Sequence, residues 1–285
     1  MTRLRTEDID HIGQDLDAYD QRLLKQTGHT LGGIACHAHG LSSDQLTAMA
    51  GSFKVCVIPL TCGQGVIHGF SAAVSCIISH LGFDAWVTQA SDAAGMAEAF
   101  ENKADIILLA DDDRFVAINV RTQCISDNSE MTAKGFVAGL DLMTSGLRGK
   151  AVLVIGCGTV GCCAARRLAA MGVMVCVCDI NPLLALALQQ QIMDELGTAI
   201  HIDNDWHATP GKYPLMIDAT PGSDVIDVSV ITPDTCVAVP GVPCGLSQEV
   251  RTTLSDRILH DPLQIGVATM VIDACIQPVR DAHDD

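Results

Sequence analysis

The segment from residue 151 to residue 179 combines residue types and spacings that suit the binding of a dinucleotide. Three glycines fit the pattern G-x-G-x-x-G, which directly follows an apolar run and opens a segment of helical spacing. In that context the first glycine permits a tight turn, the second lets the backbone approach a pyrophosphate, and the third lets the helix pack closely on its sheet. The free amides and the dipole of the helix N-terminus would then attract the phosphates. The residues expected to contact the cofactor are Gly156, Cys157, Gly158, Thr159, Val160 and Gly161.

An acidic residue stands where the ribose of such a cofactor would lie. Asp179 ends the next apolar run, eighteen residues after Gly161, and is placed to accept hydrogen bonds from the ribose hydroxyls of NAD. A 2′-phosphate would meet this negative charge and find no arginine, because Ile180, Asn181 and Pro182 follow. The sequence therefore favours NAD over NADP. The alternative is that the glycines only make a tight turn in a lobe that binds no cofactor.

Two series of alternating strands and helices surround these residues, which indicates parallel sheets covered on both faces. The first series has expected strands at 55–60, 84–89 and 105–113, then a short strand and a turn within 114–128. The second has expected strands at 151–156, 173–179, 198–202, 214–220, 235–241 and 257–260. Helices are expected at 6–26, 68–82, 92–104, 129–146 and 264–277.

The predicted fold is α/β with two lobes and a cleft between them. Residues 1–147 would form an N-terminal helix and an α/β substrate-binding lobe that ends in a connecting helix. Residues 148–278 would form a Rossmann-type domain with a doubly wound parallel sheet. Residues 279–285 form a polar tail.

Glycine- and proline-rich motifs follow several of the expected strands. In open α/β sheets, ligands bind beyond the carboxyl ends of the strands. In the second lobe the motifs DATPG (218–222) and VPGVPCG (239–245) occupy such ends, and in the first lobe LTCGQG (60–65) and LADDD (109–113) do so. Further cofactor contacts are expected from Ile180, Ala219, Thr220, Pro221, Pro240 and Gly241.

Composition excludes several classes of function. The chain of 285 residues has 34 acidic and 17 basic residues, a net charge of −17, which disfavours nucleic acid and anionic membranes as partners. No apolar run approaches the roughly 20 residues of a membrane helix, and no signal peptide is evident, so a cytoplasmic enzyme is expected. The thirteen cysteines are expected to be mostly buried thiols, and no metal site is predicted. His37 and His39 are interpreted as solvated loop residues.

The order of the motifs is similar to that of the pyrrolysine synthase (PylD) family, from the N-terminal helix to about residue 276. The resemblance rests on PLTCGQGVIHGFSAAV, ADIILLADDDRFVAIN, VLVIGCGTVG, DATPGSDVI, VAVPGVPCGLSQEVR and DPLQIGVATM. It implies NAD-dependent oxidation of the terminal amine of 3-methyl-D-ornithyl-N6-L-lysine. The α-amine of the same unit would then capture the product, closing the pyrroline ring of pyrrolysine. Cys62 stands where the family would have serine, and Asp261 where it would have glutamate.

Five residues are candidates for substrate binding. The reacting amine must be neutral to release a hydride, so Asp111 and Asp261 would anchor cationic amino groups, while solvent or a transient proton transfer removes the proton. Cys62 and Phe70 would line the pocket, and Asn128 would bind the amino-acid end. Asp111 is the best candidate for a catalytic group, although no acid or base is evident. The alternative for Asp111 is a helix cap or a solvated loop charge, for Asn128 a helix cap, and for Phe70 a plain core position.

His260 is the one histidine whose position suits catalysis. The family resemblance implies that the N-terminal helix covers the substrate, and its closure as a lid is a hypothesis; simple docking of the helix is the alternative. Two other functions stay open. One is a shikimate- or folate-type dehydrogenase, which would present a lysine at a strand end of the first lobe. The other is a non-catalytic NAD-binding sensor. The oligomeric state is open, with a homodimer among the options.

Overall fold

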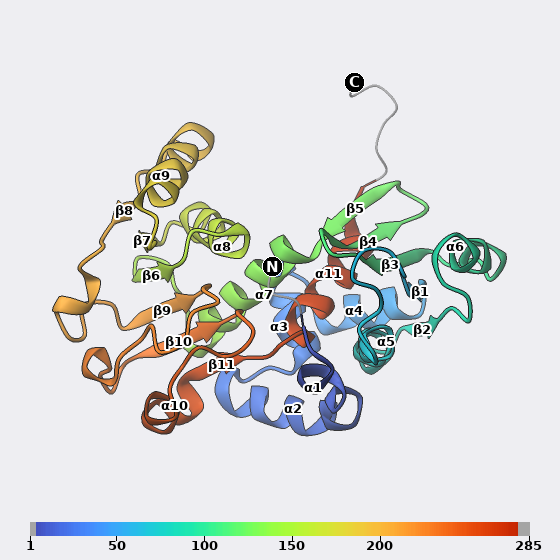
Figure 1. The fold of residues 1–285 in the computed structure, drawn as a ribbon, viewed down its shortest axis with the longest axis horizontal. Helices are drawn as coiled ribbons and strands as arrows, with labels where there is room; N and C mark the ends of the chain where they lie inside the picture. The colour runs from blue at the N-terminus through green and yellow to red at the C-terminus, as the bar shows by residue number, and fades with distance from the viewer. Residues whose placement is uncertain (1–3, 279–285) are drawn as a thin grey trace.

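The computed structural model describes residues 4–278, in which two α/β lobes flank a pair of helices (Figure 1). The first lobe begins with four helices, α1 (Thr6–Ile9), α2 (Ile12–Thr27), α3 (Leu31–His39) and α4 (Ser43–Ala50). Its strands are β1 (Lys54–Ile58), β2 (Asp84–Val87), β3 (Ile106–Ala110), β4 (Phe115–Asn119) and β5 (Cys124–Asp127). The helices between these strands are α5 (Phe70–His80) and α6 (Asp92–Glu101).

The sheet of the first lobe is mixed, with strand order β2-β1-β3-β4-β5. The first three strands are parallel, as the alternating pattern predicts, but β4 and β5 are antiparallel to their neighbours. The single short strand predicted within 114–128 is therefore a hairpin, because a connection of four residues is too short for the crossover that parallel pairing requires. Helices α5 and α11 (Gln264–Ile276) pack on one face, and α6 packs on the other.

The second lobe contains a six-stranded, wholly parallel sheet of order β11-β10-β9-β6-β7-β8. Its strands are β6 (Ala151–Ile155), β7 (Met174–Cys178), β8 (His201–Ile202), β9 (Leu215–Asp218), β10 (Cys236–Val239) and β11 (Ile258–His260). Its helices are α8 (Thr159–Ala170), α9 (Pro182–Leu196) and α10 (Gln248–Leu254), with short 3₁₀ turns at Trp206–Ala208, Val228–Val230 and Ser255–Arg257. The strand order reverses at β6, so the carboxyl end of β6 is the expected position for a ligand.

Two helices join the lobes. Helix α7 (Asn128–Met143) leaves β5 and packs on α8 and β10, and α11 leaves β11 and returns to α3, β4 and β5. Their backbones approach closely at glycines: a Cβ on Gly135 would lie 2.5 Å from Thr269 Oγ1, and one on Gly266 would lie 3.0 Å from Asn128 Oδ1. Helix α11, assigned by sequence to the second lobe, therefore belongs to the junction between the lobes.

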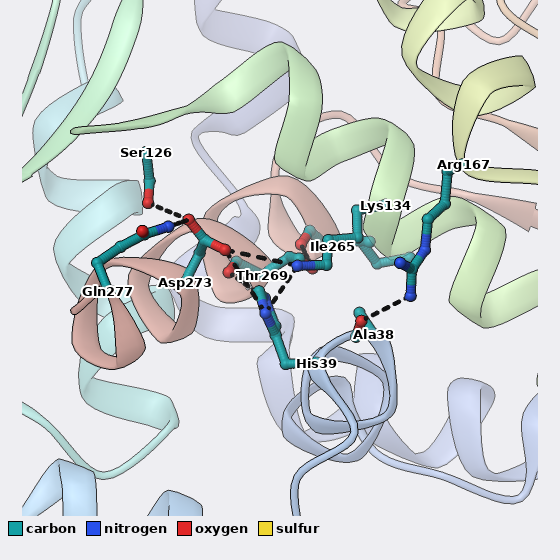
Figure 2. Close-up of polar contacts among 9 residues, drawn as sticks. All are labelled: Ala38, His39, Ser126, Lys134, Arg167, Ile265, Thr269, Asp273 and Gln277. Atoms are coloured by element: carbon teal, nitrogen blue, oxygen red, sulfur yellow. Dashed lines mark hydrogen bonds and ion pairs between the residues drawn. The ribbon is translucent and has the colours of Figure 1, made fainter. Parts of the chain in front are cut away.

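A buried polar network ties this junction together (Figure 2). His39 on α3 donates from Nε2 to the carbonyl of Thr269 and accepts at Nδ1 from Lys134 of α7, 2.9 Å away. Lys134 also faces Asp273 on α11 at 3.5 Å, and Asp273 accepts from Ser126. Burial, with the nearby charge of Lys134, lowers the pKa of His39 to about 4. His39 is therefore a neutral core residue and not the solvated loop histidine predicted from sequence.

Candidate cofactor and substrate site

A cavity of about 580 Å³ lies between the carboxyl ends of the two sheets. Both lobes contribute to its wall. The predicted site residues that line it are Cys62, Phe70, Asp111, Asn128, Gly158, Thr159, Val160, Ala219, Thr220, Pro221, Pro240 and Gly241. The structure thus brings most of the residues predicted for cofactor and for substrate to one shared space.

The glycine loop has the conformation that the spacing predicts. Gly156 follows β6 with a φ of 92°, a left-handed value that favours glycine. A Cβ on Gly161 would overlap the carbonyl oxygen of Gly156, whereas a Cβ on Gly158 would meet nothing within 4 Å. Helix α8 begins at the next residue, Thr159. Gly161 is therefore needed for packing, while Gly158 leaves open space in front of a helix N-terminus, where a pyrophosphate would fit.

Asp179 lies beside this loop at the end of β7. Its Oδ2 accepts a hydrogen bond of 2.6 Å from the amide of Cys157, and its Oδ1 accepts one of 2.7 Å from the amide of Asn181. The two hydrogen bonds fix the Asp179 carboxylate beside the glycine loop. The next residue, Ile180, is fully exposed. This position is adjacent to the cavity wall and fits the ribose end of a dinucleotide. Gly156, Cys157, Gly161, Asp179 and Ile180, all predicted to contact the cofactor, are not among the residues that line the cavity.

The loop after β9 is anchored by a buried acid. Asp218 is fully buried, and its Oδ1 accepts from both the amide and the hydroxyl of Thr220. Within residues 4–278 its Oδ2 has no hydrogen-bond partner, and burial raises the pKa of this carboxyl. Asp218 thus holds Thr220 at the cavity wall.

Two loops of the first lobe form the opposite wall and are bonded to each other. Asp112 Oδ2 accepts from the amide of Gln64 at 2.7 Å, which joins the loop after β3 to the loop after β1. Asp111 Oδ1 accepts from the amides of Asp113 and Arg114, both at 2.8 Å. These bonds hold the pKa of Asp111 below its usual value. Asp111 therefore stabilises a turn, and this ionised residue is part of the cavity wall.

Asn128 and Phe70 each begin a helix at the cavity. The cap of α7 is Asp127, which accepts from the amide of Ser129, so Asn128 is not the cap that sequence offers as its alternative role. Phe70 is half-buried and packs edge-on against Phe115, with ring centroids 5.3 Å apart. Both side chains line the cavity.

Asp261 is placed differently from the other substrate candidates. Its carboxyl accepts from the hydroxyl of Tyr19 on α2 and from the amides of Leu263 and Ile265, and only 4% of the residue is exposed. Burial raises its pKa. The carboxyl borders a small side cavity that it shares with Asn128, not the wall of the large one. Direct contact between Asp261 and a substrate stays a prediction.

Thr132 and Leu4 add to the site, whereas His260 does not. His260 donates from Nδ1 to the carbonyl of Val239, which ties β11 to β10 and does not reach the cavity wall. Thr132 and Leu4 line the cavity but were not predicted. Thr132 lies one helical turn after Asn128, so helical spacing could have identified it. Leu4 precedes α1, and no motif marks it.

The cavity wall has an unusual charge pattern. Among the described residues that line it, two are acidic, Asp111 and Asp112, and none is lysine, arginine or histidine. Cys62 is exposed there, whereas most other cysteines are buried or half-buried. Such a wall suits a cationic ligand and offers no strong base for proton transfer.

The described part of the chain contains no helix with the length and apolar character needed to cross a membrane. In residues 4–278 no three histidine, cysteine, aspartate or glutamate side chains form a group that could hold a metal ion.

Solved structures share the fold at low sequence identity. Quinate dehydrogenase from Corynebacterium glutamicum, in complex with NAD, is 16% identical with a TM-score of 0.53, covering 78% of this chain and 92% of that one. Shikimate dehydrogenase from Aquifex aeolicus is 14% identical with a TM-score of 0.52, covering 80% and 95%. At these identities the likeness establishes the two-lobed fold alone.

Sequence relatives are more specific. The family model described as "Pyrrolysine biosynthesis protein PylD, N-terminal domain" matches residues 8–126. Pyrrolysine synthase from Methanosarcina acetivorans is 30% identical over 274 residues, covering 95% of this chain and 98% of the relative. Pyrrolysine synthase from Methanosarcina barkeri is 31% identical over 273 residues, covering 95% and 97%. The chain therefore belongs to the pyrrolysine synthase family.

Proposed function

We propose that this protein oxidises the terminal amine of 3-methyl-D-ornithyl-N6-L-lysine with NAD and so allows the pyrroline ring of pyrrolysine to close. The observation that supports this most strongly is the shared cavity. One wall contains the glycine loop, and the opposite wall presents an ionised Asp111 and no basic side chain. Family membership supplies the substrate class, since the relatives are named pyrrolysine synthases.

The residues of the second lobe fit a dinucleotide. Gly158 leaves space for the pyrophosphate, the amides at the start of α8 face it, and Asp179 is fixed where ribose hydroxyls would lie. Bound NAD would accept a hydride from the carbon next to the reacting nitrogen. Asp179 favours NAD over NADP because a 2′-phosphate would meet its negative charge.

The residues of the first lobe would orient the substrate. Asp111 would hold an amino group that stays cationic, and Asn128 would hydrogen-bond the amino-acid end. The reacting amine must lose its proton, and an alkyl ammonium with a pKa near 10.4 costs about 4–5 kcal/mol to neutralise at pH 7. Since the described wall has no lysine or histidine, we assign that proton to solvent. Loss of hydride then gives an imine carbon, which the α-amine attacks with release of ammonia.

The proposal is tested by incubating the protein with NAD and the lysyl-linked methylornithine. Absorbance at 340 nm should rise, and the product should have the mass expected after loss of two hydrogens and ammonia. The rate should rise steeply above pH 8. A rate that is flat from pH 6 to pH 10 would contradict proton loss to solvent.

Asp111→Asn should raise KM for the amine by about 10- to 100-fold, because a hydrogen bond to a charged group is worth about 1.5–3 kcal/mol. Asp113→Asn is the matched control, since Asp113 is an exposed neighbour outside the cavity wall. If both substitutions changed KM equally, Asp111 would not be a substrate-binding residue.

A second candidate is a dehydrogenase of quinate or shikimate, which the shared fold favours. Turnover of either compound, without turnover of the lysyl-linked amine, would establish that function instead. Binding of NAD without turnover of any of these substrates would favour a sensor.

A further inference from the structure

Helix α5 begins at the cavity without a side-chain cap. Phe70 and Ser71, the first two residues of the helix, line the cavity wall. The residue before them is Gly69, which has no side chain to accept a hydrogen bond. The amide of Ala73 donates to the carbonyl of Gly69, but within residues 4–278 the amides of Ser71 and Ala72 have no hydrogen-bond acceptor. Two donors at the positive end of the helix dipole are therefore available to an anionic ligand.

The hydroxyl of Ser71 is an independent donor at the same place. The residue is only 8% exposed, and the surface that it does expose lines the cavity. Among the described residues, none forms a hydrogen bond with this hydroxyl. A buried hydroxyl without a partner costs stability unless a ligand or a bound water completes its hydrogen bonding. The Ser71 hydroxyl therefore indicates a polar ligand at the start of α5.

The other helices that begin at this wall have their first amides already engaged. Helix α7 is capped by Asp127, which accepts from the amide of Ser129, and Glu130 lies in its first turn. At the start of α11, Asp261 accepts from the amide of Ile265. The N-terminus of α8 faces the pyrophosphate in the proposed function. The first turn of α5 contains no acidic residue. A further anion in the cavity thus finds free donors at α5 and not at α7 or α11.

The substrate of the proposed function has one anionic group. The lysyl-linked methylornithine contains several amino groups and a single free carboxylate, on its lysine end. The described wall offers this carboxylate no lysine, arginine or histidine, and Asn128, proposed for the same end, is uncharged. We propose that the amides of Ser71 and Ala72 and the hydroxyl of Ser71 bind the lysine carboxylate of the substrate. We call these donors the α5 carboxylate site. The site rests on the proposed function, which supplies the substrate.

The topology of the sheet places the α5 carboxylate site beside the predicted amine anchor. Helix α5 follows β1 and Asp111 follows β3, and these two strands are adjacent and parallel. Phe70 packs on Phe115, which comes directly after the turn that Asp111 stabilises. An ammonium at Asp111 and a carboxylate at α5 would each meet a charge of opposite sign at the same edge of the sheet. This arrangement orients the substrate without a basic side chain, which would repel its amino groups.

Two substrates test the site: the lysyl-linked methylornithine, and its primary amide, in which a neutral carboxamide replaces the lysine carboxylate. With NAD in excess, the wild-type protein should have a KM for the acid about 10-fold or more below that for the amide, because hydrogen bonds to charged groups are the strong ones. Ser71→Ala should reduce this preference about 3- to 10-fold and leave kcat nearly unchanged, since the reacting amine is at the other end of the substrate. Ser71→Asp should abolish the preference, because a carboxylate there would cap the helix and repel the substrate.

Ser129→Ala is the matched control. Ser129 is also a serine in the first turn of a helix at the cavity wall, and it is also 8% exposed. Because Asp127 caps its helix, the ratio of the two KM values should stay at the wild-type value. The dissociation constant for NAD, measured by calorimetry, should be unchanged in the Ser71 variants. Ser71→Cys, whose thiol is a weaker donor of similar size, serves if Ser71→Ala or Ser71→Asp does not fold.

The outcomes separate this site from the proposed function. Turnover of both substrates with equal KM, or a preference that Ser71→Ala and Ser71→Asp leave unchanged, would overturn the α5 carboxylate site and leave the proposed function standing. If neither compound is turned over, calorimetric binding of each in the presence of NADH still compares the acid with the amide. A preference for the acid that depends on Ser71 would then support the site alone. Equal affinities, or no binding, would overturn the site as well.

Discussion

Mild acid should destabilise this protein through His39. The imidazole is fully buried, and its pKa is about 4 in the folded state against an ordinary value of 6.5. The unfolded chain therefore takes up a proton that the folded chain excludes. The resulting stability is complete above the unfolded pKa and is lost as pH falls from 6.5 toward 4.

The size of the effect follows from the shift. One pKa unit corresponds to about 1.4 kcal/mol, so linkage predicts a loss of about 2 kcal/mol between pH 7 and pH 5 from this one group. The loss reaches about 3 kcal/mol by pH 4. Lys134 and Arg167 lie near the ring and would repel the imidazolium, while Asp273 would offset part of that repulsion.

Urea unfolding of the wild type and of His39→Gln at pH 5, 6 and 7 measures the loss of unfolding free energy that His39 causes. Glutamine retains an amide donor for the carbonyl of Thr269 and cannot become charged. The variant should be less stable at pH 7 because its smaller side chain packs less well, but its free energy of unfolding should fall by about 2 kcal/mol less on going to pH 5. His201→Gln at an exposed position is the control. Parallel pH curves for wild type and His39→Gln would refute the reasoning.

Three further predictions concern the cavity and the glycine loop beside it, and the first has a contrasting variant. Gly158→Ala should weaken NAD binding at least 10-fold in calorimetric titration while the melting temperature stays unchanged, because the added Cβ meets only space reserved for the pyrophosphate. Gly161→Ala should instead lower stability by about 1–3 kcal/mol, since its Cβ overlaps the carbonyl of Gly156. Asp179→Ser should shift the preference from NAD toward NADP by about 10-fold or more, measured as the ratio of the two dissociation constants. Leu4→Ala should raise KM for the amine several-fold without affecting NAD binding, as expected if the N-terminal segment covers the substrate.

Each of these has an outcome that contradicts it. Equal loss of NAD affinity and melting temperature in Gly158→Ala would mean that the position is structural. An unchanged cofactor ratio in Asp179→Ser would place the ribose elsewhere, and unchanged kinetics in Leu4→Ala would dismiss the covering role. Deleting the whole of residues 1–25 is a poorer test, because Ile12, Leu16 and Leu23 belong to the core.

The alternation of apolar runs and helical spacing was sufficient to predict the strands of the second sheet. All six strands of the second sheet lie within or at their predicted ranges, and the glycine loop has its predicted turn and helix. The pattern failed where propensity was weak. Helix α3 contains two adjacent glycines and two histidines, and it exists because Leu31, Ile34 and Ala35 are buried between α7 and α11. Helices α4, α9 and α10 also have no counterpart among the predicted helices, and the predicted helix at 6–26 is divided into α1 and α2.

Site residues were predictable where they directly follow a strand. Asp111 and Thr220 follow strands directly, so the rule for ligand positions in α/β sheets was enough to place them. The partner of Asp261 was not predictable, because Tyr19 is 242 residues away and meets it only after both lobes have folded. A contact of that kind forms through tertiary packing of distant segments. No local motif or residue spacing in the sequence predicts it.

The glycine contacts between α7 and α11 have a consequence for turnover. Because there is no clearance for even one methyl group at Gly135 and Gly266, sliding of one helix along the other would at once bring atoms into repulsion. We therefore expect the angle between the lobes to stay fixed through the reaction cycle. Entry of the amine and escape of the product would then depend on the rim alone, where Gly63 and Gln64 are exposed.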